Sequence, residues 1–295
     1  MLSDEMGIPG QSPLAVVLRP MCASDIGDGL RLCRNSGWNQ VGRDWEQFLT
    51  LTPDGARVAE HDGRVVGTVA TVRYGTRFGW IGMVLVDPVV RGRGIGTLLL
   101  DHALELLADL SLVRLDATPA GHGLYLTRNF TEEGVIHRLQ GIAPGLVDPT
   151  HEVVRRMTDQ DIAEVSALDE QIFGANRATM LRWMLQGAPE YAWVATRNGR
   201  LTGYMFGRHG HAFEHMGPII AVDAETARQL ATTCLGAHAG RAFVIDAPAH
   251  TPSWQRSLEA LGFREQRPLI RMARGAGGVP GDPSRQFAVL GPEFG

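Results

Sequence analysis

The chain has 295 residues, of which 44% are hydrophobic and 20% charged, and a formal net charge of −4 at pH 7. The length fits two globular domains, and the small acidic charge argues against nucleic acid as a partner, because binding it takes a surplus of basic residues. No apolar run reaches the roughly 18 residues that span a bilayer, and the N-terminus lacks the apolar segment of a secretory signal, so we expect a cytoplasmic protein without a membrane partner.

The first half of the chain predicts a regular series of strands and helices. Residues 1–14 are rich in Gly, Pro and Ser and are expected to be disordered. The elements that follow are a strand at 15–20, helices at 24–37 and 43–53, a hairpin at 55–75, a strand at 78–88, a helix from 96 to 110, a strand at 111–118, a short helix at 121–130 and a strand at 134–141. The hairpin turns at Asp62-Gly63, a pair that favours tight turns between antiparallel strands.

The same order of elements starts again after a stretch at 143–150 that is typical of a linker. "HEVVRRMTDQDIAEV" parallels "AVVLRPMCASDIGDG", and a second hairpin is predicted at Asn198-Gly199. We therefore expect an internal duplication, with domains at 15–142 and 151–275. Residues 276–295 are Gly- and Pro-rich and are expected to form a flexible tail, in which "FAVLG" could dock as a short strand.

A glycine-rich stretch, "VRGRGIGT" (90–97), lies between the strand at 78–88 and the next helix. The first backbone N–H groups of a helix lack partners and carry partial positive charge, and glycines let an anion approach them. Arg91 and Arg93 add charge and fork-shaped donors for phosphate oxygens. The stretch is therefore expected to hold a pyrophosphate. It lacks the Lys of a P-loop, and its G-x-G-x-G spacing differs from the G-x-G-x-x-G of dinucleotide-binding folds.

The pattern Arg91-x-x-Gly94-x-Gly96 resembles the acyl-CoA signature of the Gcn5-related N-acetyltransferases (GNAT). The order of elements also resembles that fold, and "LYLTRNF" is similar to its LYxxxGF segment, with Asn129 where Gly is usual. Asn tolerates a left-handed backbone better than most residues. The resemblance implies an α/β (α+β) fold class, with two tandem acyl-CoA N-acyltransferase folds built on a mixed, mostly antiparallel sheet flanked by helices.

The resemblance also implies how the co-substrate acetyl-CoA would be bound. Backbone N–H groups of the glycine-rich stretch would cradle its pyrophosphate, and the preceding strand would pair with the pantetheine arm and polarise the thioester carbonyl. The donor-binding residues would be Leu85, Val86, Arg91, Gly92, Arg93, Gly94, Ile95, Gly96 and Thr97. Tyr125 falls at the family's general-acid position, where a phenol protonates the leaving thiolate, with packing at a helix start as the alternative.

An attacking amine must first lose a proton, because its pKa is about 10, and the sequence does not single out the base. The candidates are Glu60, Asp116 and His122, with surface or loop positions as the alternative. "SGWNQVGRDW" places Trp38 and Asn39 between the first two helices. This region commonly lines the acceptor site in the resembling fold, and core packing is the alternative.

The second copy lacks both functional marks. Where the phosphate-binding glycines should stand it has Asp223 and Glu225, whose carboxylates would satisfy the helix N-terminus and repel a pyrophosphate. Leu258 stands at the position of the tyrosine. The second copy is therefore expected to be non-catalytic, with a structural or acceptor-shaping role.

The cysteine and histidine patterns predict neither disulfides nor a metal site. Three cysteines without CxxC spacing indicate a reduced setting. The densest histidine cluster, "GRHGHAFEH" (207–215), is interpreted as a polar hairpin turn.

The sequence therefore favours an acyltransferase (EC 2.3.1.-), namely an acetyl-CoA-dependent N-acetyltransferase acting on a small-molecule amine. The alternatives are a non-catalytic acyl-CoA-binding sensor, an acetyltransferase of protein or peptide amines, and transfer of a longer acyl chain or transfer to a hydroxyl.

Overall fold

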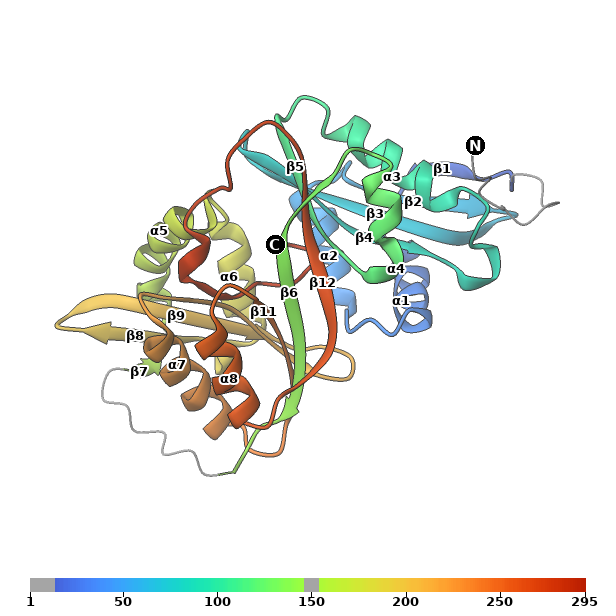
Figure 1. Ribbon diagram of the computed structural model, residues 1–295. Helices are drawn as coiled ribbons and strands as arrows, with labels where there is room; N and C mark the ends of the chain where they lie inside the picture. Colours follow the sequence, from blue (N-terminus) through green and yellow to red (C-terminus); the bar gives the residue numbers. More distant parts are fainter. Residues whose placement is uncertain (1–13, 146–153) are drawn as a thin grey trace, which may run out of the picture. The chain divides into compact units, whose positions relative to one another are not determined.

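The computed structural model describes residues 14–145 and 154–295, and Figure 1 labels their helices and strands. The expected disordered N-terminus lies outside the described residues up to position 13, and so do residues 146–150 of the expected linker. The described chain divides into two compact units: unit 1 holds residues up to Thr71 and Met83–Leu106, and unit 2 holds Val72–Gly82 and residues from Leu107 onward. Within the described residues no helix has the length and apolar character needed to cross a membrane.

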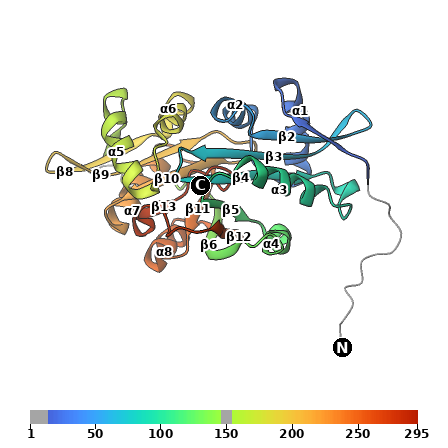
Figure 2. The ribbon, with the colours of Figure 1, turned by 90° about the horizontal axis from the view of Figure 1, so that it is seen from above.

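Unit 1 is built on antiparallel strands with helices on both faces. Its elements are β1 (Val17–Pro20), α1 (Ile26–Asn35), α2 (Gly42–Leu51), β2 (Ala56–His61), the first part of β3 (Arg64–Tyr74), the last part of β4 (Phe78–Val86) and α3 (Ile95–Leu106). β2 pairs antiparallel with both β1 and β3. Figure 2 shows α1 and α2 on one face of these strands and α3 on the other. α3 approaches β3 so closely at Gly67 that an added Cβ would lie 2.9 Å from Leu99 Cδ1.

The backbone confirms the turn chemistry expected from the sequence. Asp62 and Gly63 have φ of 49° and 75°, and Asn198 and Gly199 have φ of 52° and 71°. Positive φ at both central residues is the geometry that the tight hairpin turn requires. Asn129 has φ of 61°, so it does adopt the left-handed conformation expected where Gly is usual.

Unit 2 carries the remaining elements. They are β5 (Leu112–Ala117), α4 (Pro119–Leu126), β6 (Thr131–Ile142), β7 (Val154–Arg156), α5 (Ile162–Phe173), α6 (Ala178–Gly187), β8 (Trp193–Arg197), β9 (Arg200–Arg208), β10 (Glu214–Ala221), α7 (Ala224–Gly236), β11 (Ala242–Pro248), α8 (Pro252–Ala260), β12 (Arg264–Gly275) and β13 (Gln286–Ala288). Most strand pairs are antiparallel, and β10 and β11 pair in parallel. This architecture confirms the expected fold class.

The two sequence copies exchange their last strands within unit 2. β12, from the second copy, lies between β5 and β6 of the first copy, and β6 lies between β12 and β11 of the second. Figure 1 shows β6 and β12 as long neighbouring strands. The order β5-β12-β6-β11 is antiparallel at each step. Each copy therefore completes its sheet with a strand that the other supplies.

Two equivalent ion pairs fix the register of the exchange. Arg271 on β12 donates from Nε and Nη2 to the two carboxylate oxygens of Asp116 on β5, each at 2.8 Å. Arg138 on β6 does the same to Asp246 on β11, at 2.7 Å. The carboxylate side chains are fully buried. Burial by itself would raise the pKa of Asp246, but Arg138 outweighs burial and holds this pKa well below its usual range.

Part of the tail that the sequence predicts to be flexible is packed into unit 2. β13 pairs antiparallel with β10, in the "FAVLG" region that could dock as a strand. Phe287, Val289, Leu290 and Phe294 are all at most 3% exposed. The apolar side chains of this segment outweigh the Gly/Pro composition around them, because burying each stabilises the docked strand by roughly 1.5–3 kcal/mol.

Candidate active site

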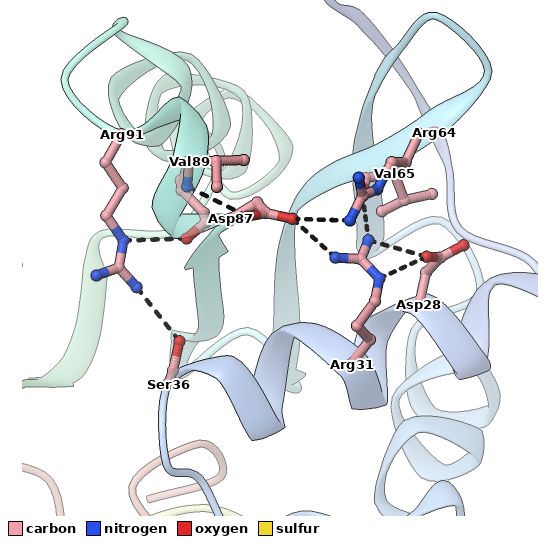
Figure 3. A network of polar contacts seen from close by, with 9 residues as sticks. Asp28, Arg31, Ser36, Arg64, Val65, Asp87, Val89 and Arg91 are labelled. Carbon is pink, nitrogen blue, oxygen red and sulfur yellow. Dashed lines mark hydrogen bonds and ion pairs between the residues drawn. The ribbon is translucent and has the colours of Figure 1, made fainter.

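The turn from β4 to α3 is anchored by a buried aspartate that no motif in the sequence marks. Asp87 is 3% exposed and caps the short helical turn Pro88–Val90 by accepting from the N–H of Val89 at 3.3 Å. Its other oxygen accepts from Arg31 Nη1 on α1 at 2.8 Å and from Arg64 Nη2 on β3 at 3.5 Å (Figure 3). These hydrogen bonds therefore hold the backbone at the start of the glycine-rich stretch against α1 and β3.

The glycines after this anchor leave the backbone open. Gly92 and Gly94 have φ of 75° and 80°, in the left-handed region that favours glycine. A Cβ added at either position would meet no atom within 4 Å. The conformation, not crowding from the protein, thus requires glycine here, and the space beside the backbone is free for a ligand.

The start of α3 presents unsatisfied donors. The first bond into the helix runs from Leu98 N–H to the carbonyl of Gly94, at 3.0 Å. The N–H groups of Ile95–Thr97 precede this bond, so they lack helical partners and lie at the positive end of the helix dipole. The first turn contains no acidic residue that would compete with an anion.

The two arginines of the motif differ in their surroundings. Arg91 is exposed, and its guanidinium reaches the Val86 carbonyl at 3.1 Å and Ser36 Oγ at 3.4 Å (Figure 3). Arg93 is half-buried, and its Nε is buried without a hydrogen-bond partner in the described part of the chain. A buried donor without a partner is uncommon in folded proteins, and an anionic ligand would satisfy it. The motif therefore fits a phosphate group.

β4 contains an irregularity that the sequence does not indicate. Met83 has φ of 56°, in the middle of a strand, and its carbonyl accepts from Thr68 Oγ1 at 2.8 Å. A left-handed non-glycine residue costs about 1–3 kcal/mol and persists only where its surroundings hold it. Leu85, two residues later, is 3% exposed. The strain thus lies two residues before Leu85, the first residue expected to pair with the acyl arm.

Tyr125 lies on α4 in unit 2, near a cap at Thr118 that accepts from Gly121 N–H at 3.3 Å. The phenol is 8% exposed and packs edge-on against Phe130, with ring centroids 5.9 Å apart. Burial raises the pKa of Tyr125 to about 12. The side chain is therefore neutral at physiological pH, which is the state a proton donor needs.

In the second copy, the equivalent helix start is satisfied by the chain itself. Asp223 caps α7 by accepting from Thr226 N–H at 2.7 Å. This backbone hydrogen bond lowers the pKa of Asp223. Glu225 pairs with Arg228, and Leu258 is fully buried. An anion would meet two carboxylates here instead of free N–H groups.

Comparisons with known proteins relate both halves of the chain to one family. Residues 29–130 match the acetyltransferase (GNAT) family, and residues 165–288 match an acetyltransferase (GNAT) domain. The chain belongs to the GNAT acetyltransferases. It carries two GNAT domains in tandem and is an acyltransferase.

Similar proteins match about four fifths or more of this GNAT chain. The uncharacterized N-acetyltransferase YitH of Bacillus subtilis is 26% identical over 242 residues, which is 80% of this chain and 83% of that protein. The holothin acyltransferase of Pseudoalteromonas is 27% identical over 239 residues, 81% of each chain. A putative acetyltransferase of Pyrococcus horikoshii has a similar structure, with a TM-score of 0.80, 20% identity and 99% of each chain covered.

The candidate bases of this GNAT protein all have partners. Glu60 accepts from Arg19 Nε at 2.7 Å, and His122 Nε2 lies 2.7 Å from a carboxylate oxygen of Glu132. Asp116 is fully buried and bound through both oxygens by Arg271, which favours a structural role for it.

The candidate acceptor residues lie in the turn after α1 in unit 1. Trp38 and Asn39 are half-buried, and the Trp38 carbonyl accepts from Arg34 Nη1 at 2.8 Å. Trp45, on α2, is fully buried, and an added Cβ on Gly29 would lie 2.8 Å from its ring. Trp45 is therefore a core residue, whereas Trp38 remains partly accessible.

The histidine-rich stretch makes ion pairs with acids. His209 Nδ1 lies 2.8 Å from Glu214 and its Nε2 3.2 Å from Glu190. Across residues 14–145 and 154–295, no group of three or more His, Cys, Asp or Glu side chains is arranged to hold a metal ion.

Proposed function

We propose that this GNAT protein is an acetyl-CoA-dependent N-acetyltransferase of small-molecule amines. The first sequence copy, 15–142, would hold the donor, and the second, 151–275, would be structural or shape the acceptor site. The observation that carries the proposal is the start of α3, where open glycines, free N–H groups and the buried Nε of Arg93 suit a diphosphate.

The chemistry follows from what the residues can donate. Leu85 and Val86 would pair with the pantetheine arm through the backbone, and an N–H of this strand would stabilise the charge that develops on the thioester oxygen. The amine nitrogen forms a bond to the carbonyl carbon, the carbon–sulfur bond breaks, and the nitrogen loses its proton to a base or a water chain. Tyr125, which burial keeps protonated, would give its proton to the leaving thiolate.

A small-molecule acceptor is supported by the chain's character and by one relative. The net charge of −4 means that the chain has no overall surplus of basic residues for binding an acidic peptide or nucleic acid. The similar protein from Pseudoalteromonas is named as the acyltransferase of holothin. Because that name specifies acyl instead of acetyl, longer acyl-CoA donors belong in the same substrate screen.

Calorimetry with acetyl-CoA tests the donor site. Gly94→Val should weaken binding roughly tenfold or more, because the side chain both strains the left-handed backbone and fills the space of the ligand. Gly63→Val is the matched control, since Gly63 also has a positive φ, of 75°, with no atom within 4 Å of an added Cβ, and sits in a hairpin turn of the same unit. Equal binding by the two variants, or no binding by the wild type, would overturn the proposal.

Turnover separates the enzyme from a sensor. An acyl-CoA-binding sensor would bind the donor and release no CoA with any amine. Thiol release across a panel of amines and acyl-CoAs, measured against hydrolysis without amine, identifies both substrates. A protein acetyltransferase would instead require a peptide amine in the panel.

A further inference from the structure

The segment after β12 lies between β10 and β11, at a position that we call the arm slot of the second copy. The arm slot corresponds to the position on β4 where the pantetheine arm of the donor is expected to pair in the first copy. In the sequence repeat, "GPII" (217–220) of β10 matches "GMVL" (82–85) of β4. β13 adds to β10 at Ile219 and Ile220, the equivalents of the residues before and at Leu85. On the other side, Val289 N–H donates to the carbonyl of Asp246 on β11, at 3.0 Å. In the second copy, β13 thus occupies the position that corresponds to the one where an acyl arm would pair with β4 in the first copy.

Close contacts hold this strand in place. A Cβ added at Gly217 would lie 2.1 Å from the carbonyl oxygen of Val289. Trp254 on α8 donates from Nε1 to the carbonyl of Phe287 at 2.7 Å. Trp254 and residues 287–290 are all at most 3% exposed. The second copy therefore has its arm slot filled from within.

The same segment continues onto β4, still within unit 2. Trp80 Nε1 donates to the carbonyl of Pro292 at 2.9 Å, and Tyr74 donates its hydroxyl to the carbonyl of Phe294. At Gly82, the counterpart of Gly217, an added Cβ would lie 2.6 Å from the carbonyl oxygen of Glu293. Glu293 is 3% exposed and paired with Arg208 on β9. Residues 292–294 thus contact β4 and the end of β3 through side-chain donors and a close approach at Gly82, whereas β13 pairs with β10 through the backbone.

Gly82 is joined by one peptide bond to Met83, the strained residue that precedes the donor-binding part of β4. We propose that residues 286–295 are a positioning segment for acyl transfer: anchored in the filled slot of the second copy, they fix the backbone of β4 at Gly82 and so hold the conformation at Met83. The inference rests on the proposed function and gives the second copy its role in it. The proposed action is indirect, through the backbone of β4.

Tryptophan substitutions at the two ends of the segment test the proposal. Trp80→Phe and Trp254→Phe each remove one N–H donor to the segment's backbone while keeping an aromatic ring. Trp193→Phe is the matched control, because Trp193 is also buried, at 8% exposed, but lies on β8. The Arg156 guanidinium carbon lies 4.1 Å from the centroid of its ring. Gly82→Ala is a second, stronger variant, because it pushes directly on Glu293.

The expected result is a separation of turnover from binding. Trp80→Phe and Trp254→Phe should lower kcat per folded molecule roughly tenfold, and Gly82→Ala more, because small misplacements at a reacting centre cost large factors in rate. The acetyl-CoA Kd should change less than about twofold, since the phosphate cradle is untouched. Trp193→Phe should alter the thermal midpoint alone.

Two outcomes are informative in different ways. If the wild type binds and transfers, and all three segment variants keep the kcat of Trp193→Phe, the positioning role is overturned and the proposed function stands. If the wild type neither binds acetyl-CoA nor releases thiol, both the positioning role and the proposed function are overturned.

Discussion

The starts of α3 and α7 differ in what satisfies their first backbone N–H groups. At α3, left-handed glycines with open space beside them precede a first turn without acids, and Arg93 keeps a buried Nε without a partner in the described chain. At α7, Asp223 accepts from Thr226 N–H and Glu225 lies in the first turn. The same strand-to-helix junction starts with open glycines in one copy and with a carboxylate cap in the other, so the fold alone does not decide what the junction can bind.

The strands that precede these helices, β4 and β10, also differ. β10 is paired by β13 at Ile219 and Ile220, so its arm slot is filled by the chain. In the second copy, a carboxylate thus caps the helix start and β13 occupies the edge of β10, while its sheet and the exchanged strand are complete. This contrast supports the proposal that the second copy acts on the first.

The largest expected effect is on stability and concerns the two buried ion pairs, Arg271–Asp116 and Arg138–Asp246, which lie at equivalent positions of the two copies. Arg271→Met should lower the free energy of unfolding by about 3–5 kcal/mol, because it leaves the Asp116 carboxylate buried without its partner. Arg138→Met should cost less, because Asp246 keeps His215 Nε2 at 2.8 Å. Urea denaturation of both variants checks this, and equal losses would show that His215 does not compensate.

The next largest effect is on turnover and tests whether Tyr125, which Leu258 replaces in the second copy, is the proton donor. Tyr125→Phe should lower kcat roughly 100-fold through loss of the proton donor, while acetyl-CoA binding stays nearly the same. Steady-state kinetics with calorimetry as the control measures both quantities. A variant with wild-type kcat would leave Tyr125 as a packing residue against Phe130.

The smallest effect tests the closed cap of the second copy. Asp223→Ala should lower stability by about 1 kcal/mol, the usual contribution of an N-cap, without changing acetyl-CoA binding. A new, second equivalent of bound acetyl-CoA in calorimetry would contradict the filled slot.

The same cap has a pH dependence with a definite sign. The pKa of Asp223 is lowered in the folded protein by the Thr226 N–H, so its ionised form stabilises the fold above the unfolded-state pKa. That contribution disappears as pH falls through the folded-state pKa. Asp223→Asn should therefore flatten the loss of the thermal midpoint below about pH 4, relative to the wild type.

Local features of the fold and site were predictable because their causes are local. The turns at Asp62-Gly63 and Asn198-Gly199 and the left-handed Asn129 follow from the conformations that these residue types allow. The left-handed glycines before α3 likewise follow from residue type and from the position of the motif before a helix. By contrast, Met83 is an ordinary residue in an apolar run, so its strain left no mark in the sequence, and the Asp87 anchor depends on Arg31 and Arg64, which lie far from it in the chain.

By itself, the sequence determined the duplicated order of elements, the family and the loss of the donor motif in the second copy, because each depends on residue type and short spacing. Only the tertiary structure decided that β6 and β12 change places, since both copies have the same strand pattern and either partner satisfies it. The structure also decided that residues 286–295 are packed instead of flexible. A few apolar side chains dock only where a sheet leaves a slot, and that slot is assembled from strands far apart in the chain.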